Sequence, residues 1–83
     1  MGDIEEVLIA LKADRFELGA AWKKAHELAQ RHEGVARYDR LHALLQRIEG
    51  DLASAAYWYR RSGEPVFEGD VMEEADLLIE RAR

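Results

Sequence analysis

One short stretch of the sequence, Tyr57-Trp58-Tyr59-Arg60-Arg61, combines three aromatic rings with two guanidinium groups. Exposed tyrosine and arginine side chains can stack on an acidic peptide or clamp it through charge-assisted hydrogen bonds. Both residue types are also common among the residues that contribute most to binding at protein interfaces. The stretch is therefore a candidate partner-binding surface.

Helical periodicity predicts different environments for the three rings. In a helix, Trp58 and Tyr59 flank Ala55 and both can enter the core, whereas Tyr57 lies more than ~90° from that direction and leans toward solvent. We expect the exposed part of this helix, joined by two lysines of an earlier helix, to contact a partner. The predicted partner-binding residues are Tyr57, Arg60, Arg61, Lys23 and Lys24.

Two histidines at the borders of apolar stripes, His26 and His42, form a second candidate site. If their helices are antiparallel neighbours, the imidazoles can meet and, with Glu49 or Glu27 nearby, hold a divalent metal. A His-x-x-x-His pair within one helix is absent, because residue 46 is Gln46. Border histidines can also be structural, since an imidazole can satisfy its hydrogen bonds without a ligand. Both interpretations remain open: a metal or ligand site with His26, His42 and Glu49, and a structural pair.

Motifs of the common enzyme classes are missing from the sequence. It has no cysteine, which excludes thiolate nucleophiles, thiolate zinc sites and disulfides. It contains neither a Gly-x-Ser-x-Gly elbow nor a glycine-rich phosphate loop. A core this small is also expected to leave little room for a pocket of ~300 Å3 or more. We therefore predict a protein that is not an enzyme and that carries no cofactor.

Length and charge narrow the class further. The 83 residues predict a single domain over 1–83, and an apolar content of 48% with 35% charged residues is typical of a folded protein. No apolar run approaches the ~20 residues of a membrane span, and the acidic start does not resemble a signal peptide, so we expect a cytoplasmic location. Residues 15–61 carry a charge of +3 and residues 62–83 a charge of −5, within a net charge of −5. We therefore expect the partner not to be nucleic acid. The acidic C-terminal segment can fold back on the basic middle.

Glycine, proline and capping residues divide the chain into helices. Breaks fall at Gly34, Gly50, Gly63 and Gly69, and Asp-x-x-Glu capping patterns start at Asp3, Asp14 and Asp70, with Asp51 as a further cap. Apolar residues recur at helical spacing between these breaks, and no segment alternates as a strand does. The predicted helices span about 4–13, 16–32, 36–48, 52–62 and 71–82. The expected fold is all-α, with antiparallel hairpins over 3–33 and 36–63 and a closing helix over 70–82.

A weak internal repeat appears when the chain is shifted by 36 residues, because Trp22 then aligns with Trp58. The stretch EGDLASAAYWYRRSGEP resembles the second helix of a tetratricopeptide repeat, with Gly50 at the turn, Ala55 at the small contact position and Tyr59 at the aromatic position. The Trp-Leu-Gly-Tyr pattern of the repeat's first helix is absent. The resemblance implies stacked helical hairpins, with both tryptophans inward in equivalent places, and a groove that binds protein or peptide.

The same stretch, read as EGDLxxAxYWYRRxG, also resembles a group of small uncharacterised bacterial proteins, which implies no activity. The favoured function is a protein–protein interaction module that recognises a protein or an acidic peptide. A small metal- or ligand-binding domain and a structural subunit of a larger assembly are the alternatives. Apolar residues outside the stripes, Ile9, Phe67 and Leu77, leave a homodimer open as well.

Overall fold

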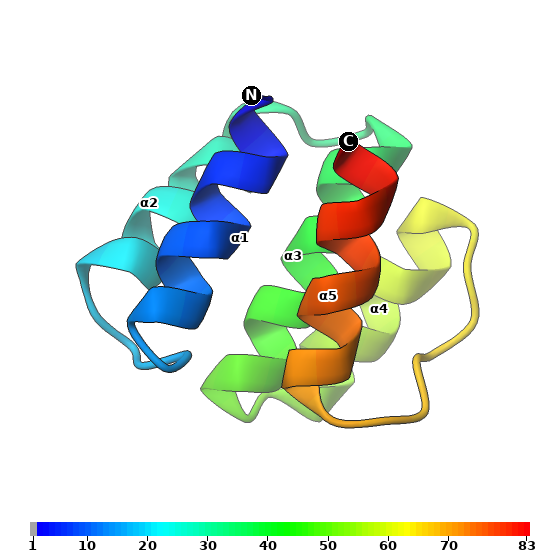
Figure 1. The fold of residues 1–83 in the computed structure, drawn as a ribbon. Helices are drawn as coiled ribbons and strands as arrows, with labels where there is room; N and C mark the ends of the chain where they lie inside the picture. The colour runs from blue at the N-terminus through cyan, green and yellow to red at the C-terminus, as the bar shows by residue number, and fades with distance from the viewer. Residues whose placement is uncertain (1) are drawn as a thin grey trace.

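The computed structural model describes residues 2–83 and contains five α-helices and no β-strand in that range (Figure 1). The helices are α1 (Asp3–Ala13), α2 (Ala20–Arg31), α3 (Ala36–Glu49), α4 (Leu52–Ser62) and α5 (Val71–Ala82). The prediction of an all-α fold with about five helices is confirmed. The predicted helix ends agree within one residue, except that α2 begins at Ala20 instead of about Phe16.

The turn between α1 and α2 explains the late start of α2. Arg15 and Phe16 have φ angles of 56° and 59°. These angles lie in the left-handed region, which residues other than glycine rarely adopt. The N–H of Phe16 donates to the carbonyl of Leu11 at 2.9 Å, and that of Arg15 to the carbonyl of Lys12 at 2.9 Å. This is the hydrogen-bond pattern of a Schellman motif, which terminates a helix. The chain therefore ends α1 here instead of starting the next helix.

Two of the four predicted caps are confirmed. The carboxylate of Asp51 accepts a hydrogen bond from the N–H of Ser54 at 3.0 Å, at the start of α4. The carboxylate of Asp70 accepts one from the N–H of Glu73 at 2.8 Å, at the start of α5. Each bond satisfies an N–H group that a helix start otherwise leaves without a partner.

The caps predicted at Asp14 and Asp3 are wrong. Asp14 follows the end of α1, and Gly19 is the N-cap of α2. Asp3 lies inside the first turn of α1, whose N-cap is Gly2. The carboxylate of Asp3 instead accepts the hydroxyl hydrogen of Tyr38 in α3, at 2.8 and 3.1 Å from its two oxygens.

The helices pack around α3. Helices α1 and α2 form one hairpin, α3 and α4 form the other, and α2 packs against α3 (Figure 1). Helix α5 packs against both α1 and α3, so it closes the two hairpins. Helix α4 packs mainly on α3 and lies at the edge of the molecule. None of the helices in residues 2–83 has the length and apolar character needed to cross a membrane.

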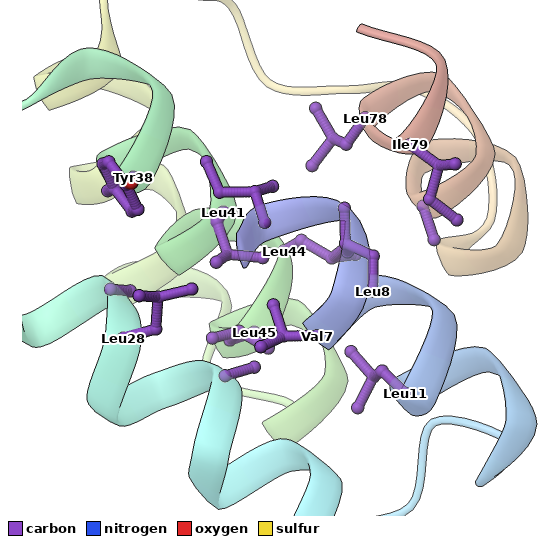
Figure 2. Packing of buried hydrophobic residues seen from close by; sticks show 14 residues of the cluster. Val7, Leu8, Leu11, Leu28, Tyr38, Leu41, Leu44, Leu45, Leu78 and Ile79 are labelled. Carbon is purple, nitrogen blue, oxygen red and sulfur yellow. The ribbon is translucent and has the colours of Figure 1, made fainter. Parts of the chain in front are cut away.

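The main hydrophobic core lies among α1, α2, α3 and α5. Figure 2 shows side chains of these helices pointing into one cluster, which includes Leu8 and Leu11 from α1 and Leu44 and Leu45 from α3. All four leucines are fully buried. A smaller cluster lies between α3 and α4, and consists of Ala43, Ala55 and Tyr59 with Trp58 and Phe67 packed against it.

A buried carboxylate joins α5 to α3 and α4. Glu74 is fully buried and accepts hydrogen bonds at 2.5 Å from each of Arg40, Arg47 and the hydroxyl of Tyr59. Burial of the hydroxyl, followed by the adjacent Glu74 carboxylate, raises the pKa of Tyr59 to about 12. The acidic C-terminal segment thus contacts the basic middle of the chain through Glu74 and through Glu64, which pairs with Arg40 at 3.4 Å.

Candidate functional site

The outer surface of α4 presents an aromatic ring beside two guanidinium groups. Tyr57 is 42% exposed, and its ring meets that of Trp58 edge to face, with centroids 5.1 Å apart. The guanidinium carbons of Arg60 and Arg61 lie 5.9 and 5.7 Å from the Tyr57 centroid. Nη1 of Arg61 also donates a hydrogen bond to the Tyr57 hydroxyl at 2.7 Å. We call Tyr57, Arg60 and Arg61 the basic aromatic patch.

The two arginines of this patch have no carboxylate partner in the described part of the chain. The hydrogen bond from Arg61 to Tyr57 holds the pKa of Arg61 above its usual value. By contrast, Arg40 and Arg47 both bind Glu74. The patch therefore keeps its positive charge and leaves guanidinium N–H groups free for an incoming carboxylate.

The predicted lysine contacts lie on a different helix from the patch. Lys24 lines a hollow of about 430 Å3 between α1 and α2, together with Val7 and Ala10. Lys23 is exposed on α2. The structure therefore brings Tyr57, Arg60 and Arg61 together and does not join Lys24 to them.

The two histidines do meet, as predicted, in a row of four stacked or edge-on rings. Nε2 of His26 in α2 lies 3.2 Å from Nε2 of His42 in α3. Trp22 stacks on His26 with centroids 4.7 Å apart, and Trp58 stacks on His42 with centroids 3.8 Å apart. The row links α2, α3 and α4 through polar rings instead of aliphatic side chains.

The tryptophans at the ends of this row are both partly buried, but they pack against different clusters. Trp22 packs against the main core, and its Nε1 donates to the carbonyl of Leu45 at 3.0 Å. Trp58 packs against the small cluster around Tyr59. The two indoles therefore do not occupy equivalent places in the core. They have in common only that each stacks on one histidine of the pair.

The surroundings of His42 indicate which of the two histidines donates the hydrogen bond between them. His42 is only 4% exposed, and its Nδ1 has no hydrogen-bond partner among residues 2–83. A buried nitrogen without a partner costs less as an empty acceptor than as an N–H donor. We therefore assign the His42 proton to Nε2, which donates to Nε2 of His26.

The pKa of His42 is lowered to about 4. Burial is the largest cause and the nearby His26 is the second, whereas Asp39 raises the pKa by a smaller amount.

The same assignment bears on metal binding by the pair. A metal on Nε2 of His42 would move the proton to Nδ1, where no acceptor lies within reach, whereas metal-bound histidines normally donate their other N–H. No group of three or more histidines and carboxylates able to hold a metal occurs in residues 2–83. Glu49 is exposed at the end of α3 and makes no hydrogen bond to either histidine. The geometry favours a hydrogen-bonded pair over a metal centre.

A hollow of about 510 Å3, which no sequence pattern indicates, lies where the start of α1, the start of α3 and the end of α5 meet. The expectation that the small core leaves little room for a pocket is wrong, because α5 packs beside α1 and leaves space at their ends. Three arginines line this hollow: Arg37, Arg40 and Arg81.

The apolar residues outside the stripes lie on two different parts of the surface. Phe67 packs against the small cluster, Ile9 is 38% exposed on α1, and Leu77 is half-buried on α5. Phe67 and Leu77 line the same hollow beside α5, whereas Ile9 lines hollows on the α1 side of the molecule.

Comparisons of this chain with protein families, with curated proteins and with solved structures gave no significant match.

Proposed function

We propose that the protein is an interaction module of tetratricopeptide-like type, in which the basic aromatic patch on α4 binds an acidic segment of a partner protein. One observation carries this proposal: an exposed tyrosine lies beside two arginines that have no carboxylate partner in residues 2–83. An acidic peptide supplies what this surface lacks, because carboxylates bind guanidinium groups through strong charge-assisted hydrogen bonds.

The chain's own acidic segment does not occupy the patch. Glu64 and Glu74 bind Arg40, Arg47 and Arg81. The patch is therefore open to another chain, which is either a different protein or a second copy of this one. The edge position of α4 makes its outer surface accessible to such a chain.

The test is affinity capture from the native cell, followed by binding of a synthetic peptide that copies the acidic segment of a captured protein. The double variant Tyr57→Ala with Arg61→Glu should lose this peptide by at least a factor of ten, because each removed group contributes a contact. Affinity should also fall as salt rises, since the contacts are ionic.

The matched control is Arg15→Glu, which makes the same charge change at an exposed residue in the turn between α1 and α2. It should bind the peptide as tightly as the unmodified protein. Equal binding by the double variant would refute the proposal. Measurement of the molar mass in solution separates a second copy from a different partner.

A further inference from the structure

The hollow at the end of the bundle has the size of a small-molecule site. Its volume of about 510 Å3 falls within the ~300–1,000 Å3 common for such sites. Ile4, Tyr38 and Leu78 form much of its apolar wall; Figure 2 labels the latter two, on α3 and α5. Ile4, Tyr38 and Leu78 belong to the main core and are only 8%, 5% and 6% exposed, so core packing fixes this wall before a ligand binds.

Acidic and basic groups of the hollow differ in how far they are satisfied. Asp3 already accepts the hydroxyl of Tyr38 at 2.8 and 3.1 Å. Glu64 already accepts two contacts from Nη1 of Arg81, at 2.9 and 3.0 Å. The charge of Glu64 is thus offset by Arg81, whereas Asp3, whose donor is an uncharged hydroxyl, keeps a negative charge that the three arginines of the hollow outnumber.

Arg37 is the lining residue with unused hydrogen-bonding capacity. Its side chain is exposed, and its guanidinium carbon lies 4.9 Å from the centroid of the Tyr38 ring. No carboxylate of residues 2–83 forms an ion pair with it. A planar guanidinium group held over a ring matches a carboxylate in two parallel hydrogen bonds.

We propose that this hollow binds a small organic acid, whose carboxylate is bound by Arg37 and whose apolar body lies against Ile4, Tyr38 and Leu78. An inorganic anion would leave the apolar wall uncovered, and an organic cation would face Arg37. A carboxylate on a short hydrocarbon body satisfies both parts of the hollow. This site is separate from the basic aromatic patch and rests on different residues.

The test is a titration of the 15N-labelled protein followed by backbone amide NMR, with hexanoate as the probe. Hexylamine has the same body with the opposite charge, and acetate has the same charge with almost no body. Hexanoate should give saturable shifts at Ala36, Tyr38 and Leu78, with an affinity at least tenfold higher than that of either control compound.

Two variants complete the test. Arg37→Glu should weaken hexanoate binding at least tenfold and, because Arg37 is exposed, should keep the amide spectrum of a folded protein. Arg15→Glu makes the same charge change outside the hollow and should leave the affinity unchanged. The proposal is overturned by equal binding of hexylamine, by unchanged binding to Arg37→Glu, or by the absence of saturable shifts at millimolar hexanoate. Shifts confined to α4 would also overturn it, and would indicate the basic aromatic patch instead.

Discussion

Acidification should destabilise this protein through His42. The imidazole is buried against Trp58 and His26, and its pKa falls from 6.5 to about 4 because burial and, next, His26 disfavour the charged form. The charged groups near it are His26 from α2 and Asp39 from its own helix, and Asp39 offsets only part of the effect. Between these two pKa values the unfolded chain binds a proton that the folded protein does not, so the free energy of unfolding falls as the pH falls.

The size of the effect follows from the two pKa values. A depression from 6.5 to about 4 corresponds to about 3 kcal/mol once the pH is well below 4, and to roughly 2 to 2.5 kcal/mol between pH 7 and pH 4.5. Small domains are stable by only ~5–15 kcal/mol, so the loss is a large share of the total. Urea unfolding followed by circular dichroism at several pH values measures it directly.

The pH dependence of stability should be compared between the unmodified protein and His42→Phe, because this variant keeps a flat ring beside Trp58 and removes the titrating group. The variant should lose less stability than the unmodified protein between pH 7 and pH 4.5, by roughly 2 kcal/mol. Titratable groups that do not interact with His42 are the same in both proteins, so their contributions to the free energy of unfolding cancel in the difference. Parallel loss of stability in the two proteins would show that His42 is protonated in the folded state as readily as in the unfolded one.

Three further predictions concern other parts of the fold. Glu74→Ala leaves Arg40, which is 3% exposed, without its main partner and should lower the free energy of unfolding by about 3–5 kcal/mol in urea; a loss below ~1 kcal/mol contradicts this. Arg15→Gly relieves a left-handed residue with φ 56° and should raise the free energy of unfolding by about 0.5–1 kcal/mol, whereas a lower value means that the turn is not strained. Zinc, nickel and manganese should shift the melting temperatures of the unmodified protein and of His42→Phe equally; a shift confined to the unmodified protein would restore the metal interpretation.

Much of the fold was predictable because local patterns report burial directly. The residues Ile4, Val7, Leu8 and Leu11 recur at helical spacing and are all buried in α1. The caps at the starts of α4 and α5 were predictable because Asp51 and Asp70 each stand just before an apolar helical pattern. A carboxylate at that position can accept a hydrogen bond from an N–H group of the first helical turn. These features depend on neighbours in sequence, so they need no knowledge of the tertiary packing.

The missed features depend on long-range packing or on unusual residues. The end of α1 has Arg15 where such a turn normally has glycine, so no local signal marks it. Glu74 did leave a signal: it lies three residues after Val71 and four before Leu78, on the apolar stripe of α5. A charged residue in that position predicts a buried partner, although the identity of that partner, Arg40, requires the tertiary structure.

The candidate site itself was predictable only in part. The exposure of Tyr57 follows from its angle on the helix, and the structure agrees at 42%. The contact between His26 and His42 follows from placing two antiparallel helices side by side, but the stacking of Trp58 on His42 does not. The hollow beside Arg37 is formed by the ends of three helices that are far apart in sequence, and no sequence pattern indicates it.

The three consecutive aromatic residues of α4 have three separate roles because each is turned by ~100° from the one before it. Tyr59 faces inward and donates its hydroxyl to Glu74, which joins α4 to α5. Trp58 covers His42 and joins α4 to the histidine pair. Tyr57 is then directed outward, where it meets Arg61. Two rings therefore attach the helix at its inner side, and the third ring is left at its outer side with Arg61.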